Sequence, residues 1–218
     1  MNRLVTRLGL ACLACVVAGA ADNAQADVTY TTVAGFDAAT TNRAFIGFDG
    51  ILPTPTSFEN YTGTTLDGAT FTSGTPGANV NLTGLAFYEA GFGFSYSADF
   101  LDASTGGAGA NTTLDVSFSK PTSALALDFG SLFAGTTTLT LSDGTVVTNN
   151  STPDLGKTEF LGFVTSTPIT GFTLSTPSTD TYVLLDLTLA TPTPEPATLA
   201  VLGVGLAGIG LVRRKRIK

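Results

Sequence analysis

Polar and apolar residues alternate in short stretches through most of the chain between residues 27 and 190. The clearest stretch is residues 136–148, where Leu139 and Leu141 alternate with threonines and Asp143-Gly144 follows. Alternation with a period of two places both leucines on one face of a strand. An Asp-Gly pair readily adopts the positive φ angles of a tight hairpin turn. The pattern therefore predicts a β-hairpin.

The same alternation predicts strands on both sides of this hairpin, whereas no stretch of useful length repeats at the 3.6-residue period of a helix. Many short strands bury their apolar faces by forming two packed sheets. We therefore expect an all-β fold, a two-sheet β-sandwich or jelly roll, over residues 27–190. In its last strand Asp186 is expected on the face opposite Val183, Leu185, Leu187 and Leu189. The other expected strands are 28–33, 45–48, 69–73, 80–82, 85–88, 92–96, 112–119 and 123–129 on either side of Pro121, 158–165, and 169–175.

The first 26 residues have the pattern of a secretory signal peptide. Arg3 and Arg7 precede an apolar stretch at residues 8–20, and a small-x-small site follows. Export would use the Sec translocon and a signal peptidase, and the cleavage site is formed by Ala24, Ala26 and Asp27. The alternative is an uncleaved membrane anchor, which needs about 20 apolar residues. The signal contains both cysteines, so we expect a mature chain that begins at Asp27 and has no disulfide.

The carboxy-terminal segment has three successive parts. Residues 191–196 form a Pro-rich stretch, which we expect to be an extended linker. Residues 197–212 contain no charge, and 16 residues in a helix span about 24 Å, somewhat less than the bilayer core. Residues 213–218 are basic and should remain cytoplasmic, which places the body across the membrane. We therefore expect a transmembrane helix at 197–212, stopped by Arg213, Arg214, Lys215 and Arg216.

The run PEPATLAVLGVGLAGIGLVRRKR closely resembles the PEP-CTERM sorting tail of Gram-negative bacterial surface proteins. The resemblance implies that Pro194, Glu195 and Pro196 are the motif read by a membrane-embedded exosortase. It further implies an inner-membrane intermediate, release to the cell surface or extracellular matrix, and a role with exopolysaccharide in a biofilm. Thr193 stands where the family often has valine. The alternative is a permanently membrane-anchored periplasmic domain, which would keep its basic tail.

Composition and charge exclude several functional classes. The chain has no histidine, which removes a Ser-His-Asp relay and an ordinary zinc site. Between residues 27 and 190 there are 3 basic and 15 acidic residues, a net charge of 3 − 15 = −12. Nucleic-acid binding requires clustered Lys and Arg, so no nucleic-acid partner is expected.

Carboxylates are the ionisable groups present in quantity, and they are the natural ligands of calcium. The order of strands after residue 119 resembles galactose-binding-type jelly rolls, in which a calcium ion joins an early loop to the final strand. That resemblance implies a structural calcium site at Asp49 and Asp186. The alternative is that both are ordinary solvent-facing residues. Weak carbohydrate binding would use aromatic faces, for which Tyr61, Tyr88 and Tyr96 are the candidates.

No motif places a catalytic or cofactor-binding residue in this chain. A glycosidase needs two carboxylates about 5 to 9.5 Å apart, one with a raised pKa, and the sequence does not single out such a pair. We therefore expect a non-enzymatic protein. A secreted glycan hydrolase remains the alternative, as does a structural matrix protein without a ligand.

Overall fold

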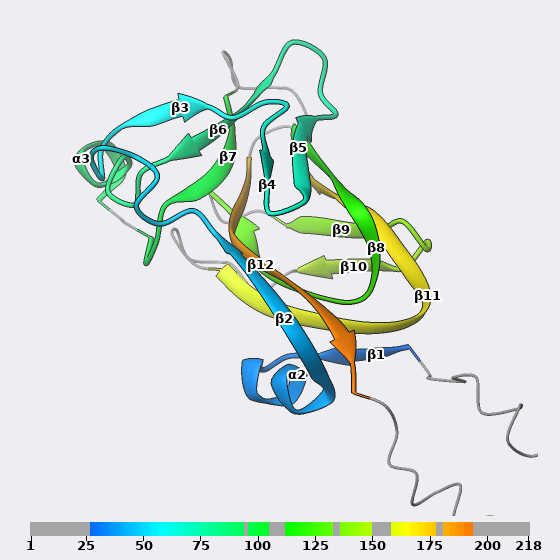
Figure 1. Cartoon of the computed structure of the whole chain (residues 1–218). Coiled ribbons are helices and arrows are strands. Elements are labelled where there is room, and N and C mark those ends of the chain that lie inside the picture. The colour runs from blue at the N-terminus through cyan, green and yellow to red at the C-terminus, as the bar shows by residue number, and fades with distance from the viewer. Residues whose placement is uncertain are drawn as a thin grey trace, which may run out of the picture.

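The structure, a computed structural model, describes residues 27–93, 96–104, 112–132, 136–149, 158–177 and 181–193 (Figure 1). The signal peptide, the motif at Pro194–Pro196, the apolar segment and the basic tail lie outside the described residues. Within them, no helix is both long and apolar enough to cross a membrane. The elements are β1 Val28–Tyr30, α2 Val33–Ala39, β2 Thr40–Gly47, β3 Phe58–Asn60, β4 Thr65–Leu66, β5 Ala69–Ser73, β6 Asn79–Thr83, α3 Glu89–Phe92, β7 Phe100–Ser104, β8 Thr112–Ser131, β9 Thr137–Leu141, β10 Val146–Asn149, β11 Thr158–Thr176 and β12 Tyr182–Pro192.

Two long antiparallel strands, β8 and β11, organise the fold by passing through both sheets of a sandwich (Figure 1). The first part of β8 pairs with β5, and the second part pairs with β12. The pairing of β11 with β8 shifts register between Val164 and Gly171, where β11 passes from one sheet to the other. One sheet therefore runs β4-β5-β8-β11-β9-β10. The other contains β1, β11, β8 and β12, extended beyond β12 by β2 and by β7-β6-β3. The expected all-β sandwich is confirmed.

The main core lies between the two sheets and is made of the inward-facing residue of each alternating pair. Residues such as Phe71, Leu114 and Leu174 come from one sheet, and Leu127, Leu82 and Leu187 come from the other. All six side chains are fully buried. Each buried side chain of this size stabilises the fold by about 1.5–3 kcal/mol relative to an exposed one.

Two smaller clusters cover the outer face of the second sheet. Phe36 of α2 packs over Ala124, Ala126, Val164 and Ala190, which are small enough to admit the helix. Elsewhere on this face, Tyr96 and Phe100 pack on Leu132, Val183 and Leu185. Gly162 lies directly under the Phe36 ring. A Cβ at position 162 would lie 2.6 Å from the ring atom Cδ2, so a larger residue would not fit there. Both clusters allow the sheet to bury parts of its outer face.

The 136–148 hairpin forms as the sequence predicts. Thr140 pairs with Val146 across the turn. Gly144 has a φ of +95°, whereas Asp143 does not have a positive φ, so only one residue of the Asp-Gly pair adopts the expected backbone conformation. The Asp143 carboxylate also accepts a hydrogen bond of 2.9 Å from the Thr145 amide. These local interactions fix the register of β9 and β10.

Several expected strand boundaries are wrong. Residues 85–88 form a turn, and Phe92, where the strand 92–96 was expected to begin, is the last residue of α3. Residues 94 and 95 of that expected strand lie outside the described residues. The strand expected at 28–33 ends at Tyr30, because Thr32 caps α2 through a hydrogen bond from the Gly35 amide to its hydroxyl (3.2 Å). Pro121 lies inside the continuous strand β8, in a stretch where the ladder with β11 is irregular.

The face predicted for the last strand is also wrong in part. Leu187 lies in the main core, whereas Val183 and Leu185 lie in an outer cluster. A register shift between Leu184 and Asp186 changes the alternation, because a bulge adds one residue to β12. The strand continues to Pro192, so residues 191 and 192 of the expected linker are paired with β2.

Candidate functional site

The two residues implied as calcium ligands are brought together on the second sheet. Asp186 of β12 lies opposite Gly47 of β2, two residues before Asp49. Asp186 also lies opposite Asp128 of β8. Directly opposed residues in an antiparallel pair have Cβ atoms about 4.5–5.5 Å apart and point to the same face. Asp128 is therefore a third carboxylate of this site, and the sequence analysis missed it.

Burial and mutual repulsion disfavour charge at this site. Burial, followed by the charges of Asp128 and Asp49, raises the pKa of Asp186 to about 6. Burial also raises the pKa of Asp128, although a hydrogen bond from Thr158 partly opposes the shift. The Oδ1 atom of Asp128 is buried and has no hydrogen-bond partner among the described residues. A proton or a cation near Asp128 and Asp186 would relieve this unfavourable arrangement.

The three carboxylates lie near one another, but they are not arranged as a set of metal ligands. Asp49 Oδ1 already accepts a hydrogen bond of 3.1 Å from the Asp99 amide. In the part of the chain that the structure describes, no three Asp, Glu, His or Cys side chains are arranged to hold a metal ion. The calcium interpretation of Asp49 and Asp186 therefore stays a prediction.

A separate carboxylate, Asp102 of β7, is almost completely enclosed. Its side chain is 1% exposed and accepts hydrogen bonds from the hydroxyls of Thr83 (3.0 Å) and Tyr88 (2.7 Å). Burial raises the pKa of Asp102 to about 7, although both hydrogen bonds oppose the shift. The Tyr88 ring also stacks near Phe100, with ring centroids 6.1 Å apart. Asp102 therefore fixes the position of Tyr88 on the outer face.

The three candidate tyrosines for carbohydrate binding are not equivalent. Tyr61 and Tyr96 are buried and contribute to packing. Tyr88 is half-buried and contacts the exposed ring of Phe87, at 5.1 Å between centroids. Phe87 in turn contacts Phe58 of β3. Tyr88 is therefore the candidate that belongs to a surface aromatic group, together with two phenylalanines, Phe58 and Phe87, that the sequence analysis did not single out.

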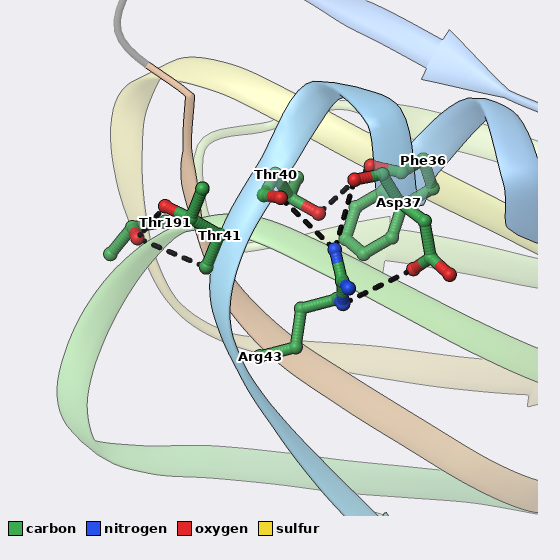
Figure 2. Close-up of polar contacts among 6 residues, drawn as sticks. All are labelled: Phe36, Asp37, Thr40, Thr41, Arg43 and Thr191. Carbon is green, nitrogen blue, oxygen red and sulfur yellow. Dashed lines mark hydrogen bonds and ion pairs between the residues drawn. The ribbon is translucent and has the colours of Figure 1, made fainter.

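The point where the sorting segment leaves the fold lies at the carboxyl end of β12. The Thr191 hydroxyl contacts both the hydroxyl (3.1 Å) and the carbonyl oxygen (3.1 Å) of Thr41, as Figure 2 shows. It also accepts a hydrogen bond from the side-chain amide of Asn42 (3.2 Å). The Thr193 amide donates to the Ala39 carbonyl (2.8 Å). The fold therefore holds the chain up to the residue before Pro194.

The β2 side of this attachment is held by α2 (Figure 2). Arg43 Nη1 donates to the carbonyl oxygens of Asp37 (2.9 Å) and Thr40 (3.0 Å). Arg43 Nε lies 3.3 Å from Asp37 Oδ1 in an ion pair between half-exposed side chains. The Thr40 hydroxyl donates to the carbonyl of Phe36 (2.8 Å). These bonds join the end of α2 to the strand that borders β12.

Two solved structures have weak similarity to this chain. A mutant of a carbohydrate-binding module of family 29 has 11% identity and a TM-score of 0.33, over 71% of this chain and 96% of the module. The enzymatically active domain of bacteriophage CBA120 tailspike protein 4 has 15% identity and a TM-score of 0.34, over 63% of this chain and 22% of that domain.

The sequence comparisons concern the carboxyl end. No curated protein matches the chain. The segment after β12 does match a known signal, as its proline motif and basic end predict. This signal indicates export, exosortase processing and sorting to the surface of a Gram-negative cell. Residues 192–216 are a PEP-CTERM protein-sorting motif.

Proposed function

We propose that residues 27–190 form a non-enzymatic component of an exopolysaccharide or biofilm matrix, which binds carbohydrate weakly. The observation that carries the proposal is the PEP-CTERM motif at residues 192–216, directly after the last strand of a β-sandwich. The chain passes through the inner membrane by the Sec route and loses its signal before Asp27. An exosortase then cuts at or near Pro194–Pro196 and releases the body.

The attachment point supports this order of events. Thr193 is held by the Ala39 carbonyl, and only residues 194–196 separate it from the apolar segment at 197. The four Cα–Cα steps from residue 193 to residue 197 span at most about 14 Å when fully extended. In the uncut chain, the end of the body that carries α2 and β2 therefore stays close to the membrane. Cutting at the motif is what allows the body to move away from that surface.

The proposal is tested by the mass and cell fraction of the protein from its native host. The wild type should begin at Asp27, lack residues 197–218 and occur outside the cell. A variant with Pro194, Glu195 and Pro196 all changed to Ala should stay in the inner membrane at its uncut mass. The matched control changes the exposed Pro-Thr-Pro run at residues 53–55 of the body to Ala, and this variant should be cut and released like the wild type.

A wild type that keeps its basic tail in the membrane would contradict processing and identify a permanently anchored periplasmic domain. Release of the protein without retention by matrix polysaccharide would leave sorting intact and reject the carbohydrate role. These two results test the sorting of the protein and its carbohydrate binding separately.

A secreted glycan hydrolase is the second candidate, and one observation favours it. Asp128 and Asp186 face each other on neighbouring strands, and the pKa of each is raised. A pair of this kind can divide acid and base roles between two carboxyl groups. The hydrolase predicts turnover of the matrix glycan that Asp128→Asn and Asp186→Asn each abolish. The matrix proposal predicts no turnover by the wild type.

A further inference from the structure

The outer face of the three strands β3, β6 and β7 combines aromatic and amide side chains. Phe58 of β3 is 56% exposed, and Phe87 in the turn before α3 is 36% exposed. Their rings meet edge to face with centroids 5.5 Å apart. Isolated exposed apolar residues are common, but two phenylalanines that leave much of their surface in contact with water form a defined apolar corner.

A row of polar side chains lies beside this corner on the same face. Asn60 of β3 is opposite Asn81 of β6, and Asn81 is opposite Asp102 of β7. Phe58 and Thr83 form a pair two residues further along the register, so their side chains share the face of Asn60 and Asn81. Asn60 is exposed and Asn81 is half-buried. Asn60 Oδ1 already accepts a hydrogen bond from the Thr62 amide (2.9 Å), so Asn60 offers mainly its NH₂ group as a donor. The Asn81 amide can both donate and accept hydrogen bonds.

The apolar corner formed by Phe58 and Phe87 is held in place by Tyr88 and by the loop before β3. Tyr88 contacts Phe87 and donates its hydroxyl proton to the buried Asp102 carboxylate. The turn that carries Phe87 also binds the loop before β3, through a hydrogen bond from the Ala86 amide to the Pro55 carbonyl (2.9 Å). Gly84 fits against Pro55 so closely that a Cβ would come within 2.4 Å of that carbonyl oxygen. This support presents the two rings in a fixed arrangement before any ligand binds.

The charge around this face selects the kind of ligand. Glu89 is exposed on α3, directly after Phe87 and Tyr88, whereas Glu59 alternates with Phe58 and Asn60 along β3 and therefore lies on its other face. The basic residues among those described are Arg43 on β2 and Lys120 on β8, and neither is on β3, β6 or β7. An anionic polysaccharide would therefore meet repulsion without a compensating cation. A neutral sugar instead offers C–H faces to the rings and hydroxyls to the amides.

We propose that Phe58, Phe87, Asn60 and Asn81 form a binding site for a neutral polysaccharide on the outer face of β3, β6 and β7. This inference rests on the proposed matrix function and deepens it by naming the site and the class of glycan. Figure 1 shows β3, β6 and β7 at the end of the molecule opposite the start of β1 and the end of β12. While the chain is still tethered, these strands therefore lie at the end of the body that is distant from the membrane.

The test uses the full chain, purified from the cell fraction that contains it, and measures its retardation in native gels that contain a dissolved polysaccharide. The neutral probes are dextran, a soluble β-glucan and galactomannan, and the anionic probe is alginate. We expect retardation by at least one neutral probe and none by alginate. Phe58→Ala and Phe87→Ala should each weaken binding about tenfold or more, because each removes one buried aromatic contact from the complex. Asn81→Ala should weaken it less.

The matched control is Phe45→Ala, because Phe45 is a 64% exposed phenylalanine on β2, outside the proposed site. Its affinity for the neutral probe should equal that of the wild type. Circular dichroism of every variant checks that the fold is retained, and Phe87→Leu provides an apolar variant without an aromatic face if Phe87→Ala does not fold. Equal binding by all variants, binding to alginate alone, or binding to no neutral probe would overturn the site. So would self-association through β3 that Phe58→Ala abolishes in the absence of glycan binding.

The same variants separate this inference from the matrix proposal. Neutral-glycan binding by a chain that remains uncut in the inner membrane would support the site and contradict the proposed function. A released, matrix-associated chain whose glycan binding is unchanged by Phe58→Ala and Phe87→Ala would support the function and overturn the site.

Discussion

The tether end of the molecule is the end where β12 finishes and the sorting segment begins. There, hydrogen bonds among Thr41, Asn42 and Thr191 hold β2 and β12 together. At the opposite end, β6 and β7 enclose the Asp102 carboxylate beneath an aromatic group (Figure 1). Neutral hydroxyl and amide groups do not titrate near physiological pH, whereas a carboxylate with a pKa of about 7 does. The first end is therefore suited to holding a tether across the physiological pH range. The second end should respond to pH.

The ion pair at the tether end does not change this contrast. Arg43 and Asp37 are half-exposed, and exposed ion pairs contribute about 0–1 kcal/mol. The end depends instead on α2, whose Phe36 side chain fills a cluster of small residues on the outer face. The following variants weaken each end separately, in order of decreasing expected effect.

Phe36→Ala should have the largest effect, because it removes the buried ring that attaches α2 to the second sheet. Phe36 is 1% exposed, and a buried Phe-to-Ala change typically costs about 3–5 kcal/mol. Urea unfolding followed by circular dichroism measures the loss. Val33→Ala, an exposed position on the same helix, is the control and should change the free energy of unfolding by less than about 0.5 kcal/mol. Equal losses in both variants would show that α2 is not held through Phe36.

Asp102→Asn should change the pH dependence of stability at the other end. The folded pKa of Asp102, about 7, exceeds its unfolded value of 3.8, so ionisation opposes folding. The stability contributed by this group is fully present below about pH 4 and is lost as the pH rises through 7. The loss is at most roughly 4 kcal/mol, at 1.36 kcal/mol per pKa unit. Unfolding free energies measured from pH 4 to 8 should fall less steeply in Asp102→Asn than in the wild type.

Asp143→Asn is the control for this measurement, because Asp143 lies in the β9–β10 turn and has the same formal charge. It should keep the slope of the wild type, which includes the general repulsion within an acidic protein. An Asp102→Asn variant that also keeps that slope would contradict the assignment of the pH response to the buried carboxylate.

Calcium binding at Asp49 and Asp186 should produce a smaller change. At pH 8, above the Asp186 pKa of about 6, the Asp186 carboxylate is ionised and able to bind a cation. If the dissociation constant is about 1 mM, as in extracellular modules, 10 mM calcium adds about 1.4 kcal/mol of stability. The melting temperature of the wild type should rise with calcium, and Asp186→Asn should lose that rise. An equal rise in Asp186→Asn, or none in the wild type, would leave these carboxylates as ordinary acidic residues.

Local pattern accounts for the parts of this molecule that the sequence predicts well. The β9–β10 hairpin depends on Asp143-Gly144 and on alternation with a period of two, both visible in a few consecutive residues. The sorting motif is also a continuous segment, residues 192–216, so its pattern is visible in the sequence without knowledge of the fold. By contrast, α2 has seven residues and α3 has four, too few to establish a helical period.

The site depends on contacts that are distant in sequence, and a single chain does not reveal them. Asp128 joins Asp186 only because β8 and β12 are neighbours. The bulge near Asp186 moves Leu185 away from the core that Leu187 enters, although both fit one alternating pattern. Phe58 is exposed because β3 is at the edge of its sheet, and residue type alone favours the core.

Thr191→Val should have the smallest effect, and it is confined to the tether end. The change removes the hydroxyl contacts to Thr41 and Asn42 while it keeps the branched shape favoured in a strand. Because Thr191 is exposed, water replaces part of each lost bond, and the cost should be about 0.5–1 kcal/mol. Hydrogen exchange of the Thr193 amide, which donates to Ala39, should become faster, because the strand end opens more often. Thr148→Val on β10 is the control and should leave that exchange unchanged. Faster exchange in both variants would mean that the end of β12 opens only when the whole domain unfolds. The Thr191 hydrogen bonds would then not stabilise that end locally.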